Sequence, residues 1–132
     1  MTAPTVVILD DLKSRVGRPS SYPHIYDRDF ELLPLNQDPG SGEEHYLARY
    51  PSGLRANWHR HSAAHTMIVL EGRMEANGQV VEPPAYCHFP AGQPMHHAPA
   101  GEAGCLFVLI FHGPFDVEAV DPPLPQPSTS TG

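Results

Sequence analysis

Turn-forming residues interrupt this chain so often that no long helix fits between them. Of its 132 residues, 16 are proline and 11 are glycine. Between His45 and Val120, apolar strand-like runs recur about ten residues apart, the spacing that all-β sandwiches and barrels show. One interruption, Asn77-Gly78 in RMEANGQVVEP, suits a two-residue hairpin turn. We therefore predict an all-β fold, a single antiparallel barrel or sandwich.

Composition divides the chain into three parts. Residues 1–44 are predicted to supply an N-terminal edge strand, TVVIL at 5–9, and an irregular segment that contributes to the barrel or to a dimer. Residues 45–120 hold the strand-like runs and are predicted to form the barrel. Residues 121–132 are rich in Pro, Ser and Thr, with Leu124 as the only large apolar side chain. Such a segment buries too little to offset its ordering entropy, so we predict a disordered tail.

Charge and apolar content exclude several classes of protein. The formal net charge is −7 and the basic residues are scattered, which argues against a nucleic-acid or polybasic membrane surface. No apolar run approaches the ~20 residues of a membrane helix, and no signal peptide is recognisable. Cys87 and Cys105 each lie in an apolar segment and are expected to be buried free thiols. We expect a soluble cytoplasmic protein.

The stretch HRHSAAH places three imidazoles at His59, His61 and His65. If the stretch is one strand, these residues share parity and point to one side of the sheet. Burying three imidazoles without partners costs several kcal/mol, about 1–3 kcal/mol for each, and a bound metal is the usual remedy. A histidine hydrogen-bonded in the core, a surface loop, and an unmetallated pH switch are the alternatives.

A fourth ligand is expected from MHHAP. His96 and His97 are neighbours, so in a strand they point to opposite faces and only one of them can bind. The two other histidines of the strand-like segments, His88 and His112, are expected to be satisfied by ordinary hydrogen bonds.

The first histidine segment resembles the first motif of the cupin superfamily. Gly53, then His59-x-His61, His65 and Gly72 follow the spacing of that motif, although cupins usually have glutamate where this chain has His65. The resemblance implies a cupin-type, jelly-roll-like β-barrel with one divalent metal, and a homodimer formed through N-terminal strands. With histidine at this position, the chain resembles a minority of small cupins that have an all-histidine site, including manganese-binding ones and polyketide cyclases.

Pro90-Ala91-Gly92 followed by histidine resembles the second cupin motif, with two departures. The motif begins with Pro84 instead of glycine, and one extra residue precedes His96, or two precede His97. The spacing from Gly92 favours His96 as the ligand. The H-x-P pattern ahead of a Gly-Cys pair, as in related small cupins, favours His97.

The predicted site is therefore a divalent transition metal on His59, His61, His65 and His96 (or His97). Mn, Fe, Ni, Cu and Zn all accept imidazole, so the metal stays open. Four protein ligands leave two positions on an octahedral ion, adjacent in the cupin arrangement, which an enol-ketone, a hydroxy-ketone or O₂ can occupy. A closed four-ligand zinc site would instead be structural.

The predicted function is a metal-dependent oxidoreductase of the dioxygenase type, acting on a small hydrophobic oxygen-containing substrate. A non-oxidative cyclase or isomerase, and a non-catalytic metal- or ligand-binding module, are the alternatives. Tyr50 and Tyr86 are the candidate catalytic residues. The candidate substrate pocket consists of Met67, Tyr86, Met95, Phe107, Leu109 and Phe111.

Overall fold

The fold was analysed in a computed structural model, which describes residues 3–114 and 116–123. Strands dominate, as the spacing of turn residues predicts. One short helix precedes them, α1 (Leu9–Leu12), followed by a single 3₁₀ turn at Lys13–Arg15. The strands are β1 (Arg18–Ser20), β2 (Phe30–Asp38), β3 (Glu43–Tyr50), β4 (His59–His61), β5 (His65–Glu71), β6 (Arg73–Ala76), β7 (Gln79–Val81), β8 (Ala85–Phe89), β9 (His97–Ala100), β10 (Cys105–Phe111) and β11 (Val117–Ala119).

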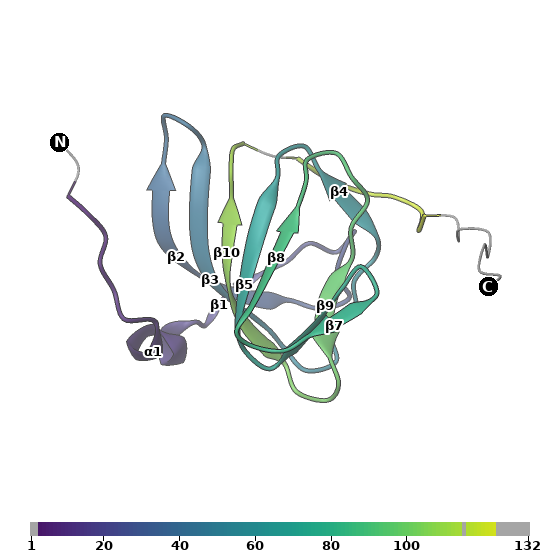
Figure 1. Cartoon of the computed structure of the whole chain (residues 1–132), viewed down its shortest axis with the longest axis horizontal. Coiled ribbons are helices and arrows are strands. Elements are labelled where there is room, and N and C mark those ends of the chain that lie inside the picture. The colour runs from purple at the N-terminus through teal and green to yellow at the C-terminus, as the bar shows by residue number, and fades with distance from the viewer. Residues whose placement is uncertain (1–2, 115, 124–132) are drawn as a thin grey trace, which may run out of the picture.

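The strands form two layers. One is a six-stranded sheet in the order β1-β2-β3-β10-β5-β8, and every pairing in it is antiparallel. The other layer consists of the pair β11-β4 and the three-stranded sheet β7-β6-β9. Figure 1 shows these small sheets lying across from the large one. The all-β, antiparallel, jelly-roll-like prediction is confirmed.

The main core fills the space between the layers. Strand β10 lies between β3 and β5, and its side chains alternate between the two faces of the sheet. Phe107 is fully buried on the inner side, whereas its neighbour Val108 belongs to a smaller cluster on the outer side. The inner cluster also contains Cys87 and Cys105, both free and buried as predicted.

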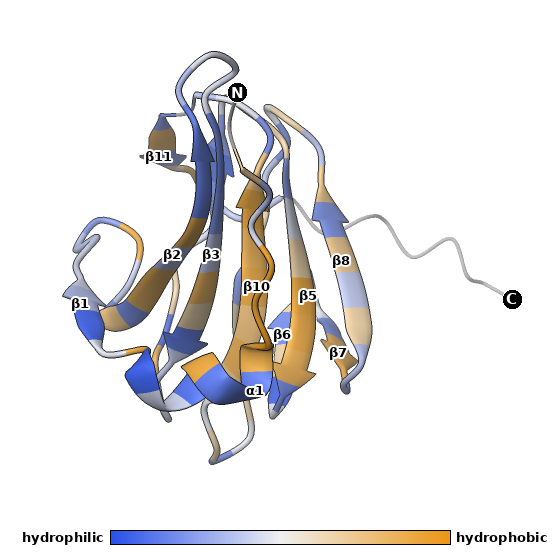
Figure 2. Cartoon of the chain, turned by 90° about the vertical axis from the view of Figure 1, so that its left-hand side faces the viewer, coloured by the Kyte–Doolittle hydropathy of each residue, from blue (hydrophilic) through white to orange (hydrophobic). Residues whose placement is uncertain are grey.

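The N-terminal segment covers part of the outer face of the large sheet. Leu9 and Leu12 of α1 pack on the outer cluster around Leu47 and Leu106. Figure 2 shows α1 crossing the lower end of this face, over the apolar strands β10 and β5. Lys13 anchors the segment by an ion pair with Glu71, in which Nζ and Oε2 are 2.9 Å apart.

The predicted edge strand TVVIL is wrong. Residues 3–8 form no strand in this part of the structure, and Leu9 begins α1 instead. The side chains that suggested a strand are largely in solvent: Val6 is 86% exposed and Ile8 67%. A short apolar run cannot by itself distinguish a strand from a segment that leads into a helix. The predicted tail lies mostly outside the described residues, which end at Pro123.

The hairpin at Asn77-Gly78 is confirmed. Both residues have positive φ, 48° and 88°, and they connect β6 to β7. This is the backbone that a two-residue turn of the right twist requires.

None of the helices in the described residues has the length and apolar character needed to cross a membrane.

Gly72, between β5 and β6, lies in a close backbone contact with Gly104, which precedes β10. Its φ is +76°, and a Cβ placed on it would lie 2.2 Å from the carbonyl oxygen of Gly104. Gly78 also has positive φ, but a Cβ there meets nothing within 4 Å. Comparing substitutions at these two glycines therefore distinguishes the cost of backbone strain from the cost of a steric clash.

We expect Gly72→Ala to lower the free energy of unfolding by more than 2 kcal/mol, roughly, because left-handed strain and a backbone clash act together. Gly78→Ala, the control, carries only the strain, about 1–2 kcal/mol. Urea denaturation of both variants measures the difference. Equal losses would show that the chain relaxes around residue 72.

Candidate metal centre

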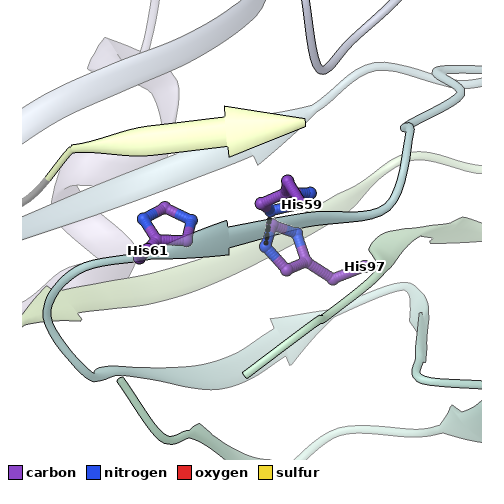
Figure 3. Close-up of side chains that lie close together, drawn as sticks. All are labelled: His59, His61 and His97. Carbon is purple, nitrogen blue, oxygen red and sulfur yellow. Dashed lines mark hydrogen bonds between the residues drawn. The ribbon is translucent and has the colours of Figure 1, made fainter. Parts of the chain in front are cut away.

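Four buried histidines meet between the two layers. His59 and His61 lie on β4, His65 begins β5, and His97 begins β9. All are buried, with at most 6% of each residue exposed. Figure 3 shows His59 and His61 on one strand and His97 reaching toward His59 from another. The barrel therefore brings together histidines that are far apart in sequence, at residues 59–65 and at residue 97.

The spacing of the ring nitrogens suits a shared ion. Nε2 of His59 and Nε2 of His97 are 3.2 Å apart. Two nitrogens bound to one zinc at about 2.0–2.1 Å lie about 3.3 Å apart at the tetrahedral angle. His61 completes a group of three whose ligand atoms all lie within 4.8 Å of one another. These three residues are thus a fitting donor set for a transition metal.

His65 lies beside this group. Its ring centroid is 4.5 Å from that of His61 and 5.5 Å from that of His97. Both of its ring nitrogens are buried and make no hydrogen bond within the described residues. Leaving a buried polar group without a partner costs about 1–3 kcal/mol, which a metal ligand bond would remove. His65 therefore fits as the fourth ligand.

His65 faces His59 and His61 as predicted, but parity along one strand is not the reason. The stretch HRHSAAH is not one strand: residues 62–64 turn the chain between β4 and β5. His59 and His61 share a face of β4 because they alternate with exposed Arg60. His65 reaches the same space from the facing large sheet, where it pairs with Phe111 of β10.

The structure brings His97, and not His96, to the other histidines. Nδ1 of His96 lies 2.5 Å from a carboxylate oxygen of Glu75, and its Nε2 lies 3.0 Å from the carbonyl oxygen of Ala56. Both ring nitrogens are thus engaged on the far side of β9. The spacing from Gly92 that favoured His96 fails because His96, just before β9, is held by Glu75 and Ala56, which leaves His97 to face the other histidines.

Two ligands are oriented by partners outside the group. Nδ1 of His59 donates to the carbonyl oxygen of Asn57 at 2.8 Å, which leaves its Nε2 as an acceptor in the neutral ring. Nδ1 of His97 lies 2.8 Å from Oη of Tyr50, and Tyr50 is in turn 2.7 Å from Oη of Tyr26. For His97 to bind a metal through Nε2, Nδ1 must carry the proton and donate to Tyr50.

Burial keeps the site neutral. Desolvation lowers the pKa of His61 to about 3 and that of His65 to about 2, with a smaller lowering from neighbouring imidazoles. It also lowers the pKa of His59 and, strongly, that of His97. Burial raises the pKa of the Tyr50 hydroxyl, so this group stays protonated. Neutral imidazole is the form that binds metals.

A cavity of about 640 Å³ opens onto the four histidines. Three of the residues predicted to form the substrate pocket line it: Met67, Leu109 and Phe111. Tyr50 lines it as well, beside His97.

The other three predicted pocket residues lie elsewhere. Tyr86 is on the outer face of β8 and 69% exposed, and it does not line the cavity, which removes it from both the pocket and the catalytic candidates. Met95 and Phe107 are buried core side chains that do not reach the cavity. Phe107 shares a strand face with Leu109, but Tyr50 packs on it at a ring distance of 4.7 Å.

His88 and His112 are satisfied, as expected. Both bind the hydroxyl of Thr66, through Nδ1 at 2.9 Å and Nε2 at 2.8 Å respectively. Thr66 points to the side of β5 opposite His65 and Met67, so this cluster is separate from the cavity.

Tyr26 is the residue of the site that sequence reasoning missed. It precedes the first long strand and joins the barrel by an isolated bridge to Ala56. Its hydroxyl reaches Tyr50, and its ring packs against that of His59 at 6.1 Å. No periodicity or spacing in the sequence connects residue 26 with residues 50 and 97.

We expect Tyr50→Phe to weaken zinc binding about 10- to 100-fold, because His97 loses the partner that fixes its tautomer. Competition with a chromophoric chelator measures the affinity. Tyr46→Phe is the matched control, since Tyr46 lines the same cavity but hydrogen-bonds to Glu44 and touches no ligand. An unchanged zinc affinity in Tyr50→Phe would rule out this role.

We also expect the protein in the presence of EDTA to lose stability as the pH falls below about 6.5. The folded-state pKa values of the four histidines lie below the unfolded value near 6.5, so the unfolded chain binds more protons. For each such histidine, the free energy of unfolding falls by up to about 1.4 kcal/mol per pH unit below pH 6.5. Above pH 6.5 this stability is fully retained. Urea denaturation from pH 7.5 to 5 should show a shallower pH dependence in His65→Gln; equal slopes would contradict the buried, neutral state of His65.

Comparison with known proteins agrees with this architecture. The ChrR Cupin-like domain matches residues 23–116. The chain has no match among curated proteins. Of solved structures, a cupin-like protein from Thermotoga maritima is similar with a TM-score of 0.67 and 18% identity, covering 80% of this chain and 86% of that chain.

Two enzymes have the same fold. An acetylacetone dioxygenase from Acinetobacter johnsonii gives a TM-score of 0.63 at 17% identity, over 88% of this chain and 78% of its own. The polyketide cyclase RemF from Streptomyces resistomycificus gives a TM-score of 0.58 at 19% identity, over 72% of this chain and 73% of its own. At these identities the likeness concerns the fold alone. Because the family match spans more than two thirds of the sequence, this chain belongs to the ChrR Cupin-like domain family and has the cupin fold.

Proposed function

We propose that this protein is a metal-dependent enzyme that acts on a small hydrophobic, oxygen-containing substrate, with dioxygenase-type oxidation as its reaction. One observation carries the proposal: four buried imidazoles lie at the inner end of a cavity of about 640 Å³. A structural metal needs no such space beside it, whereas a substrate does.

The proposed ligands are His59, His61, His65 and His97. All four are nitrogen donors, so Mn, Fe, Ni, Cu and Zn remain open. When bound, the metal would supply Lewis acidity toward substrate oxygens and, for a redox-active ion, a path for dioxygen chemistry. Four neutral ligands would leave the full +2 charge at the inner end of the cavity.

The rest of the cavity has two tasks in this proposal. Tyr50 and the carbonyl oxygen of Asn57 hold His97 and His59 in the orientations that direct Nε2 inward. Met67, Leu109 and Phe111 form an apolar wall that contacts the substrate and excludes water from the metal. Tyr50 places its hydroxyl 2.8 Å from Nδ1 of His97, and the Tyr26 hydroxyl lies beside it.

Oxidative chemistry is preferred over two alternatives. A dioxygenase and a polyketide cyclase share the fold, so a non-oxidative cyclase or isomerase is the second candidate. A non-catalytic metal- or ligand-binding module is the third; the cavity argues against a metal-only role but suits ligand binding equally well. A cytoplasmic location and a homodimer, with a small molecule as the only ligand besides the metal, complete the proposal.

The test combines metal loading with a substrate panel. We expect stoichiometric metal in the purified protein, and oxygen uptake with at least one redox-active metal on a panel of 1,3-diketones, phenols and styrenes. His61→Ala should lose at least 100-fold in rate, as removal of a metal ligand implies. An oxygen electrode and product mass spectrometry give the readout.

His88→Ala is the matched control, because His88 binds Thr66 on the outer face and should leave the rate unchanged. Formation of a product without oxygen uptake would favour the cyclase or isomerase function over the dioxygenase function. Metal binding without any substrate conversion would leave the non-catalytic module.

A further inference from the structure

All lysine and arginine side chains lie outside the cavity lining, whereas His24 belongs to it. The sequence has eight lysine and arginine residues, all of them in the described part of the structure, and none lines the cavity. They are Lys13, Arg15, Arg18, Arg28, Arg49, Arg55, Arg60 and Arg73.

Several of these cations are held on other surfaces. Arg49 donates to the carbonyl oxygens of Lys13 and Val16 under the N-terminal segment. Arg60 alternates with His59 and His61 on β4, points outward, and forms an ion pair with Glu118. These two arginines are therefore held by contacts outside the cavity.

Two carboxylates, in contrast, line the cavity. Glu44 is half-buried and accepts a hydrogen bond from the Tyr46 hydroxyl, and Asp116 is exposed beside β11. Neither belongs to an ion pair with a lysine or arginine. Much of the remaining lining is apolar, with Phe30, Leu32, Met67, Leu109 and Phe111.

The cavity lining therefore contains two carboxylates but no lysine or arginine. With a metal bound, the buried histidines hold a positive charge to which no lysine or arginine of the lining adds, and anionic oxygens of a ligand are favourable there. A second anionic group on the ligand would lie against the apolar lining or near Glu44 and Asp116, with no lysine or arginine to pair with. In water-poor surroundings such a charge is costly to desolvate.

We infer that the cavity selects substrates that are uncharged everywhere except at the oxygens that meet the metal, and that it discriminates against carboxylate- or phosphate-bearing compounds. This inference rests on the proposed function, because it describes the substrate of that same site. It narrows the class to neutral diketones, phenols or comparable aromatic compounds, and excludes sugar phosphates and dicarboxylates.

A matched ligand pair tests the inference. The zinc-loaded protein, which cannot carry out redox chemistry, is titrated by calorimetry with 1-phenylbutane-1,3-dione and with the same compound carrying a para-carboxylate. We expect the neutral diketone to bind at least tenfold more tightly. In Glu44→Gln/Asp116→Asn the difference should shrink at least threefold, and added salt should shrink it in the wild type.

Glu71→Gln is the control, since Glu71 is also a carboxylate but pairs with Lys13 on the outer face. It should leave the ratio of the two affinities unchanged. Equal or tighter binding of the carboxylate, no binding of either diketone, or a ratio unaffected by the double substitution would each overturn the inference. Absence of oxygen uptake or product in the activity assay, with the binding preference intact, would overturn only the proposed function.

Discussion

Two backbone hydrogen bonds between His59 and Met95 hold the centre of this protein together. The amide of His59 donates to Met95 at 3.0 Å, and the amide of Met95 donates to His59 at 2.7 Å. They attach the short strand β4 to the segment that leads into β9. Since β4 has only three residues, this bridge and the amide of Gly92, which donates to the carbonyl oxygen of His61 at 2.8 Å, are what place His97 beside His59. The arrangement of the ligands thus depends on main-chain contacts more than on the histidines themselves.

Much of this architecture could be predicted from residue patterns, because local chemistry determines it. Asn77-Gly78 has a backbone that few other pairs adopt, so its hairpin is visible in the sequence. TVVIL is different: an apolar run of that length has no internal preference between strand and coil, and packing of α1 on the outer sheet decided it.

The site was only partly predictable for the same reason. His59 and His61 share a face because they alternate along one strand. The choice between His96 and His97 depended on Glu75 and Ala56, which are distant in sequence and meet His96 only in the folded chain. Tyr26 reaches the centre across a segment without periodicity, so nothing local indicates it. Contacts across the barrel, and not spacing in the sequence, determine whether such residues belong to the site.

The contact at Gly72 extends further than its own turn. A Cβ on Gly104 would lie 2.2 Å from the carbonyl oxygen of Tyr50, just as one on Gly72 would lie 2.2 Å from the carbonyl oxygen of Gly104. Three main chains are therefore stacked without side chains between them, and the third belongs to the residue that holds His97. A methyl group added at Gly104 would push on the backbone of Tyr50 directly, and one added at Gly72 would push on the backbone of Gly104. Positions that touch neither metal nor substrate can in this way alter how firmly a ligand is held, and a search for tuning mutations should include them.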